Sequence, residues 1–439
     1  MSERDEALTL AENVLKAASG ADQAQVTVTL TDAAYARFGQ NFVTQNLESR
    51  QTVIELAYYS GKRVGRVSSG DVSSGAIERL VASAATIAGR VPPDNGFVSL
   101  PKPEAIPAGV KSYYASTADA GPDERVEKLL PVFARMKRSN LTTAGYTTTQ
   151  VQTVAIANSL GVRAAYTGTT GGIEIKAMAP QTSGYAAFYT PDYAALESAP
   201  LADHAATKAT VAAVPADLTA GVYTVVMEPN AFQSALKALI EGLGAQSVLE
   251  DKESWMVDVL GQAIFSPNFT LRDDWSNPLL ANAPFARDGS PADRPTLIER
   301  GVPKTYLAGT YAANKYKVKR VNGTQSYVVD PGTKSRDELI ASVERGVLIS
   351  RTWYDRVVDP RRAAITGITR DGVYLIENGK LTKTLKNFRY FVSMVDVMKD
   401  VEFSNTALRT APELDLGVSL VVPDAKFARF NLAVQTSYA

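Results

Sequence analysis

The sequence predicts an α+β protein built in two parts, and three observations lead to that prediction. Its 439 residues are 45% hydrophobic and 21% charged, close to globular averages, so the chain can bury a substantial core. The first half mixes helix-like periodicity with strand-like alternation, whereas short β-rich runs dominate from Val347 onward. A chain of this length also favours more than one domain.

The N-terminal segment predicts a helix on either side of a group of strands. Apolar residues at helical spacing define the first helix, which Gly20 ends. Gly61 provides the turn of a hairpin, and Ser73 is a typical N-cap for the second helix. The expected elements are a helix over 3–18, strands over 25–30, 35–43, 52–59 and 63–67, and a helix over 73–88.

A proline-rich connector and a mixed segment follow. Five prolines over residues 91–110 exclude a helix or a central strand there. A helix that begins at Pro122 should kink or end near Pro131. Residues 151–178 predict two strands around a turn at 158–161, where a glycine allows positive φ.

The alanine-rich residues 191–215 mark the expected domain boundary. They separate an N-terminal α+β domain, 1–215, from a C-terminal, mainly β domain, 216–439. The second domain opens with an apolar strand over 222–227, and an amphipathic helix follows it. Ser335 begins a capping box, which is the sequence signature of a further helix N-terminus.

The cysteine and histidine counts exclude whole classes of catalytic site. The chain has no cysteine and one histidine, His204. Disulfides, thiolate nucleophiles, cysteine-ligated zinc and zinc sites with two histidines are therefore excluded. A Ser-His-Asp triad would have to use His204, but this residue lies in an alanine-rich segment and is expected at a surface or boundary.

Charge and hydropathy limit the partners and the location of the protein. Lys and Arg number 46, as do Asp and Glu, so the formal net charge is zero and nucleic acid is not expected as the main partner. The acidic, polar start is unlike a secretory signal, and no run of about 18 apolar residues occurs. We therefore expect a cytoplasmic protein without a membrane span.

One pair of adjacent aspartates could bind a cation. Asp273 and Asp274 could offer carboxylate oxygens to a hard metal ion. A turn-forming or capping role is favoured instead, because the turn-like residues 275–278 follow directly.

Five segments form an ordered set of motifs along nearly the whole chain, at residues 37–46, 158–161, 271–274, 297–302 and 366–379. The first fits the pattern R-F-x-x-N-x-x-T-Q and the second fits N-S-x-G. In this order they resemble the TldD/PmbA family, also known as TldD/TldE. The resemblance implies an N-terminal α/β domain with long antiparallel strands and flanking helices, and a mainly β, barrel-like C-terminal domain with a few helices.

The resemblance also implies which chemistry to look for. TldD-type members carry a helical H-E-x-x-x-H motif and a distant cysteine that together bind zinc for peptide hydrolysis, whereas PmbA/TldE-type partners lack these ligands. The corresponding positions here are Ile240, Glu241 and Ala245, so only the glutamate is retained. A glutamate without zinc has no activated water to deprotonate. We therefore expect no catalytic, cofactor-binding or metal-binding residue in this chain.

The resemblance thus implies a zinc-free subunit of a heterodimeric metalloprotease that acts on unfolded or extended peptides, with zinc bound by a TldD-like partner. Two alternatives stay open. One is a stand-alone homo-oligomeric protein, such as a homodimer, that binds peptides. The other is a hydrolase that works alone through carboxylates such as Glu241, Asp273 and Asp274.

Overall fold

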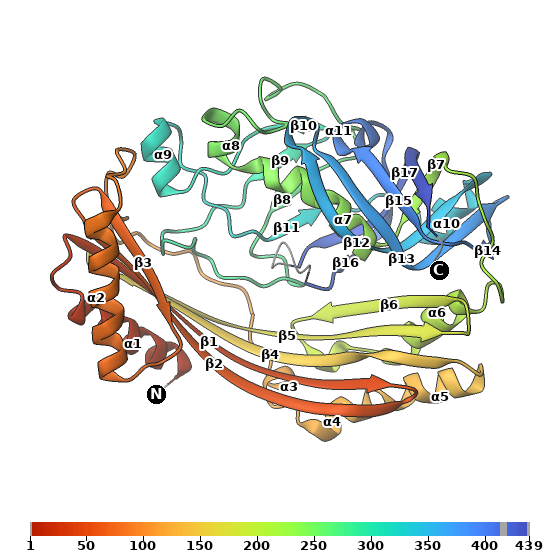
Figure 1. Cartoon of the computed structure of the whole chain (residues 1–439), viewed down its shortest axis with the longest axis horizontal. Coiled ribbons are helices and arrows are strands. Elements are labelled where there is room, and N and C mark those ends of the chain that lie inside the picture. The colour runs from red at the N-terminus through yellow and green to blue at the C-terminus, as the bar shows by residue number, and fades with distance from the viewer. Residues whose placement is uncertain (1, 413–418, 437–439) are drawn as a thin grey trace.

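Two β-sheets organise the chain. In the computed structural model, which describes residues 2–412 and 419–436, a six-stranded antiparallel sheet comes from residues 23–190 and an eleven-stranded mixed sheet from residues 221–435 (Figure 1). Helices flank the first sheet, and the second half contains few. The α+β class predicted from the sequence is confirmed.

The first sheet has the spatial order β3-β2-β1-β4-β5-β6. Its strands are β1 (Gln23–Gly39), β2 (Phe42–Ser60), β3 (Arg63–Ser69), β4 (Thr142–Asn158), β5 (Arg163–Met178) and β6 (Ser183–Thr190). The helices of this half are α1 (Glu3–Ala17), α2 (Ser74–Arg90), α3 (Ala115–Ala118), α4 (Pro122–Glu127), α5 (Leu130–Arg138) and α6 (Ser198–Ala209).

Most local predictions for this half are confirmed, and one strand is corrected. The hairpin at Gly61 and the interruption at Pro131 are present, because α4 ends at Glu127 and α5 begins at Leu130. The strand expected over 35–43 is wrong. Gln40 and Asn41 adopt positive φ angles of 51° and 68°, so the chain reverses there and β1 pairs with β2.

Side chains point alternately to the two faces of the first sheet, and the face with the apolar residues is the one that the helices cover. Val26, Val28 and Leu30 of β1 are buried in one cluster with α1 and α2, and farther along the same face Phe38 packs with α5 and α6. Figure 1 shows α3, α4 and α5 on the side of this sheet that faces away from the second sheet. On the opposite face the proline-rich connector packs, with Phe97 stacked on Tyr59 at 4.2 Å between ring centroids.

The second half is a mixed sheet with short helices. Its strands are β7 (Gly221–Met227), β8 (Leu271–Asp273), β9 (Thr296–Glu299), β10 (Val302–Pro303), β11 (Tyr327–Val329), β12 (Arg345–Asp359), β13 (Ala364–Glu377), β14 (Lys380–Thr384), β15 (Phe388–Ser393), β16 (Glu402–Arg409) and β17 (Val421–Gln435). Its helices are α7 (Pro229–Ile240), α8 (Ala245–Leu249), α9 (Thr310–Tyr316), α10 (Arg336–Ala341) and α11 (Met394–Val397). Within the described residues of the whole chain, no helix is long and apolar enough to cross a bilayer.

Strand β7 closes part of the second sheet into a ring. It pairs in parallel with β12 and antiparallel with β17, and β12, β13, β15 and β17 are hydrogen bonded in that order. The ring surrounds an apolar core to which α7 contributes Phe232, whose ring lies 6.0 Å from that of Phe427 of β17. This near-ring is the barrel-like arrangement that the motifs implied.

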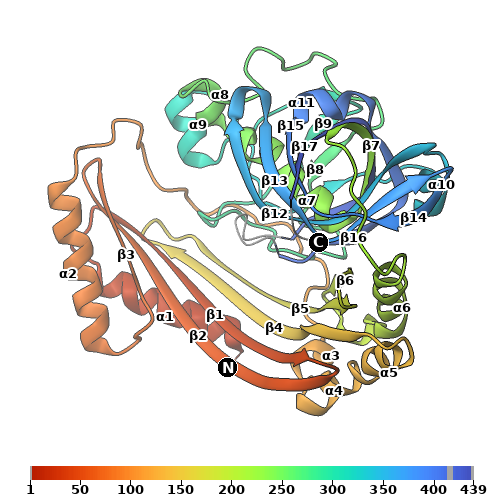
Figure 2. The ribbon, with the colours of Figure 1, turned by 45° about the vertical axis from the view of Figure 1, so that its right-hand side comes forward.

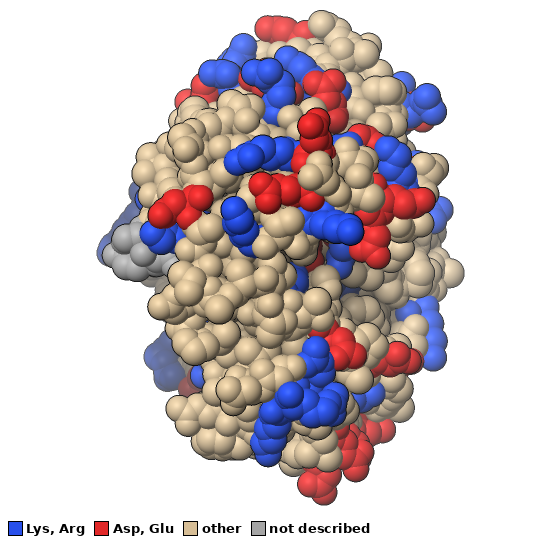
Figure 3. Space-filling view, turned by 90° about the vertical axis from the view of Figure 1, so that its right-hand side faces the viewer, with Lys and Arg blue, Asp and Glu red and all other residues tan. Residues whose placement is uncertain are grey.

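The two halves meet along a seam. Figure 2 shows the strand ring above the curved first sheet, with α6 beside the junction. From the side (Figure 3), positive and negative side chains are interspersed, and an uncharged band separates the charges of the upper half from those of the lower half. Neither sign of charge dominates this side of the molecule.

Candidate functional site

Helix α7 positions the residues that the motif comparison selected. Pro229 at its first turn and the N-cap Glu228 begin the helix directly after β7. It ends at Ile240, and a 3-10 turn, η2 (Glu241–Leu243), leads to Gly244 in an extended conformation before α8 begins. Positions 240 and 245 therefore lie on two different helices rather than on one continuous helix.

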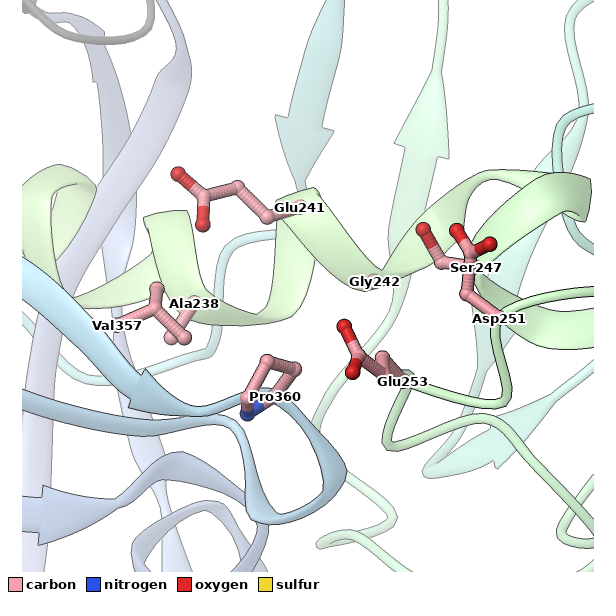
Figure 4. A pocket seen from close by; sticks show the side chains of 8 residues that line it. All are labelled: Ala238, Glu241, Gly242, Ser247, Asp251, Glu253, Val357 and Pro360. Carbon is pink, nitrogen blue, oxygen red and sulfur yellow. The ribbon is translucent and has the colours of Figure 1, made fainter.

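A pocket of about 190 Å³ opens at this end of α7 (Figure 4). It contains three carboxylates, of which Glu241 comes from η2 and the other two, Asp251 and Glu253, from the loop after α8. Figure 4 shows Asp251 beside Ser247 on one side of the pocket and Glu241 on the other. The remaining lining residues are Ala238, Gly242, Val357 and Pro360.

Glu241 is a half-exposed carboxylate with a cation nearby. Its side chain is 45% exposed, and its Oε1 lies 3.6 Å from the Nζ of Lys237, one helical turn earlier. The Lys237 side chain is itself buried, at 7% exposed, and the separation is longer than a hydrogen bond. The carboxylate is therefore accessible from solvent and from the pocket, and a catalytic role for it is neither required nor contradicted by these contacts.

The residues at the predicted motif positions do not fit a zinc ion. Ile240 and Ala245 are buried, apolar and part of packed helices, and neither offers a nitrogen, oxygen or sulfur ligand from its side chain. Over residues 2–412 and 419–436, no group of three or more His, Cys, Asp or Glu side chains is arranged to hold a metal ion. We accordingly derive no chemical step through a metal in this chain.

His204 lies at the opposite end of α7, in an ionic cluster between the two halves. Its Nε2 is 2.7 Å from Oε1 of Glu228, and the Nζ of Lys208 donates to Glu228 Oε2 at 2.6 Å and to Ser350 Oγ at 3.0 Å. Arg336 lies 3.6 Å from the same carboxylate. The cluster joins α6 of the first half to α7, α10 and β12 of the second, so the histidine has a boundary position, as the sequence predicted.

The electrostatics of this cluster favour an ionised carboxylate. Burial alone would raise the pKa of Glu228, but the ammonium of Lys208, with His204 and the guanidinium of Arg336, outweighs burial and holds that pKa well below its ordinary value. Arg336 in turn donates from Nε to Asp424 Oδ1 at 2.6 Å. The buried charges therefore compensate one another.

The two aspartates with possible cation-binding roles accept hydrogen bonds from backbone amides instead. Asp273 is fully buried and accepts hydrogen bonds from the amides of Thr324, Gln325 and Ser326. Asp274 accepts from the amide and hydroxyl of Ser276 at 3.0 and 2.6 Å. Neither residue lines the pocket that contains Glu241. Asp274 thus has the turn-forming role that the following residues indicated, whereas Asp273 holds the distant loop at residues 324–326.

Sequence reasoning found one carboxylate of the pocket and missed two. The run Glu250-Asp251-Lys252-Glu253 is an acidic segment that could have been marked as a candidate. Its proximity to Glu241 depends on the break at η2, which directs the chain back across the end of α7. No sequence signal indicated that break beyond Gly242 and Gly244.

Comparison with known sequences identifies two domains of one family. The domain described as "PmbA/TldA metallopeptidase C-terminal domain" matches residues 220–434, and the one described as "PmbA/TldA metallopeptidase central domain" matches residues 103–213. A metalloprotease of Methanocaldococcus jannaschii is 22% identical over 195 residues, which are 42% of this chain and 43% of that protein. The alignment thus spans less than half of that relative.

Solved structures share the fold over almost the entire chain. TldE from Thermococcus kodakarensis superimposes with a TM-score of 0.87 at 19% identity, covering 97% of this chain and 100% of that one. Two proteins described as candidate modulators of DNA gyrase, from Thermotoga maritima and Bacteroides thetaiotaomicron, each give a TM-score of 0.82, at 16% and 20% identity. Each match covers 97% of this chain, and 99% and 98% of the other chain.

Proposed function

The chain belongs to the PmbA/TldD metallopeptidase family, and from this premise we propose that it is the zinc-free, TldE-type subunit of a two-chain metallopeptidase. One observation carries the proposal. The sequence contains one histidine and no cysteine, and that histidine contacts Glu228 at the end of α7 opposite the pocket. The zinc and the general base would belong to a TldD-like partner.

The contribution of this chain would be to bind unfolded or extended peptide and to present it to the partner. The face of the first sheet turned toward the strand ring is suited to this role. Thr31, Tyr35, Gln150 and Gln152 lie on that face, accessible at least in part and uncharged. Such side chains can hydrogen bond to any peptide backbone without selecting a particular sequence.

A reconstitution assay tests this function. The isolated chain should not cleave unfolded casein or unstructured peptides, and cleavage should appear when a purified H-E-x-x-x-H homologue from the same organism is added. Chelation should abolish that activity, and Glu241→Gln in this chain should leave it within about twofold, because the general base would be in the partner. Failure of the two chains to associate or to cleave together would refute the proposal.

The pocket gives one observation in favour of a second candidate, a hydrolase that uses carboxylates. Glu241, Asp251 and Glu253 line one pocket, and a closely spaced pair of carboxyl groups can divide acid and base roles. Turnover by the isolated chain that resists chelators and disappears in both Glu241→Gln and Glu253→Gln would favour this alternative. Asp273 and Asp274 would have no part in it, since both lie outside the pocket.

A further inference from the structure

Part of the outer face of the strand ring has no covering layer. Over one portion the first half of the chain packs on it, where Tyr374 donates to the Ser183 carbonyl and Lys176 pairs with Asp371 at 2.5 Å. Farther along the same strands no helix or loop among the described residues replaces this cover. The uncovered portion carries Trp353, Tyr354, Arg370, Arg389, Phe391 and Val434, and we call it the Arg-aromatic face.

Strand register makes these residues one continuous surface. Trp353 of β12 pairs with Ile368 of β13, Ile368 pairs with Arg389 of β15, and Arg389 pairs with Val434 of β17. Directly opposed residues on one face of a sheet lie side by side. Tyr354, Val434 and Phe391 are 65%, 57% and 46% exposed, so large apolar groups on this face remain in contact with water.

The charge of this face has one sign. Its charged side chains in the described strands are arginines, and the guanidinium groups of Arg351 and Arg370 lie 5.3 and 5.2 Å from the Trp353 ring. The nearest carboxylates, Asp355 and Asp371, are buried, and Asp371 pairs with Arg351 at 3.2 Å and with Arg370 at 3.7 Å. Among the described residues Arg389 forms no ion pair with a carboxylate, although it is exposed. Arginine and aromatic residues are also the types that dominate binding energy at protein interfaces.

Backbone strain marks the same place. Tyr354 adopts a φ of 56°, a conformation unfavourable for a residue with a bulky side chain, at a bulge between Trp353 and Arg356. The bulge turns Tyr354 outward, and its ring packs edge-on to that of Trp353 at 5.5 Å between centroids. A strained residue that projects an aromatic ring into solvent is more useful to a binding partner than to the isolated fold.

We propose that the Arg-aromatic face docks a different protein whose surface combines carboxylates with apolar side chains. This inference rests on the proposed function, in which that protein is the zinc-binding subunit. The charge of the face selects it over a second copy of this chain. A symmetric self-contact would place arginines against arginines. The pocket of Glu241 lies at the end of the same strand, on the core side, where Val357 of β12 and Pro360 of the following turn line it.

The test measures the affinity of this chain for its purified zinc-binding homologue by sedimentation velocity at 50 and 300 mM salt. Arg389→Glu should weaken the complex at least tenfold at low salt and should reduce the salt dependence of the dissociation constant, since an attractive charge becomes a repulsive one. Tyr354→Gly should also weaken binding, while its melting temperature stays equal or rises because the strain is relieved. Arg63→Glu, at an exposed arginine on β3, is the matched control and should bind like wild type.

Each outcome decides a separate point. No complex with the wild-type chain would refute both the proposed function and this surface. A complex that Arg389→Glu and Tyr354→Gly leave unchanged would refute the surface alone. Self-association of the wild-type chain that Arg389→Glu abolishes would show that a second copy occupies the face, and would also overturn the proposal.

Discussion

Helix α7 has a glutamate at each end, and the surroundings of the two carboxylates are opposite. Glu228, before the first turn, is buried and lies within 3.6 Å of two cationic side chains and of His204. Glu241, after the last turn, is half exposed beside one lysine and shares a pocket with two further carboxylates. The comparison shows that neighbouring charge and burial, rather than residue type, determine what a carboxylate does in this fold.

The two carboxylates of this helix therefore have different roles, one in stability and one at an accessible surface. The N-terminal end of α7 is fixed to the first half of the chain through Lys208 and His204, so it sets the relative position of the two halves. At the C-terminal end, the carbonyls of Leu239 and Gly242 accept hydrogen bonds from the buried Trp255 and Ser254 side chains, whereas the Glu241 carboxylate reaches solvent. A variant of Glu228 should therefore change stability, whereas a variant of the Glu241 carboxylate should change recognition or nothing.

The largest expected effect comes from removing a charge at the buried, N-terminal end of α7. Lys208→Met removes the closest cation and leaves Glu228 buried with incomplete compensation, so the free energy of unfolding should fall by about 3–5 kcal/mol. Urea denaturation followed by circular dichroism measures this loss. Lys62→Met, in the exposed hairpin loop, should change stability by less than about 0.5 kcal/mol. Equal effects of the two variants would mean that the cluster does not hold the halves together.

A smaller effect is expected at the other end, from apolar packing rather than charge. Ile240 is buried in the core beneath the ring, so Ile240→Ala should cost about 2–4 kcal/mol through the cavity it leaves. Glu241→Gln, one residue later, should be nearly neutral because its carboxylate is half exposed and lies 3.6 Å from the Lys237 ammonium, beyond hydrogen-bond distance. Denaturant titration of both variants compares the loss in the free energy of unfolding at two adjacent positions. Small and equal losses would show that this end of the helix is not packed as described.

The smallest expected effect is a difference in acid sensitivity. The pKa of Glu228 is lower in the folded chain than in the unfolded chain. Its contribution to stability is thus complete above the unfolded value, near 4.5, and is lost as the pH falls through the folded value. Melting temperatures of Glu228→Gln from pH 7 to pH 3 should fall less steeply below about pH 4.5 than those of wild type. Glu241→Gln should follow the wild-type slope, and a wild-type slope in Glu228→Gln would contradict this assignment.

The sequence predicts an element well when neighbouring residues determine it, and poorly when residues far apart in the chain do. Elements fixed by neighbouring residues were predicted correctly, such as the hairpin at Gly61 and the helix capped by Ser335, whose side chain accepts from the amide of Glu338. The turn at Gln40 and Asn41 was missed because two non-glycine residues adopt positive φ there. Local propensity gives no signal for such a turn when a long hairpin imposes it.

The site was less predictable than the fold. The contacts of Lys208 with Ser350 and of Arg336 with Asp424 join residues far apart in sequence, and no periodicity reports such pairs. The motif comparison directed attention to Glu241, which does lie in a pocket. The assignment of Ile240, Glu241 and Ala245 to the family motif, and the domain boundary after residue 215, stay predictions.

The closure of the strand ring has a consequence for how the chain is made. Strand β7 is synthesised early in the second half, yet one of its two ring neighbours is β17, among the last residues that the structure describes. Until β17 emerges from the ribosome, an apolar strand edge stays unpaired, and nascent chains with open edges are prone to associate wrongly. Pairing over such a sequence distance is also slow. Folding of this half should therefore wait for the synthesis of β17 and be chaperone-sensitive, in contrast to the first sheet, whose β1–β2–β3 meander can form as it is synthesised.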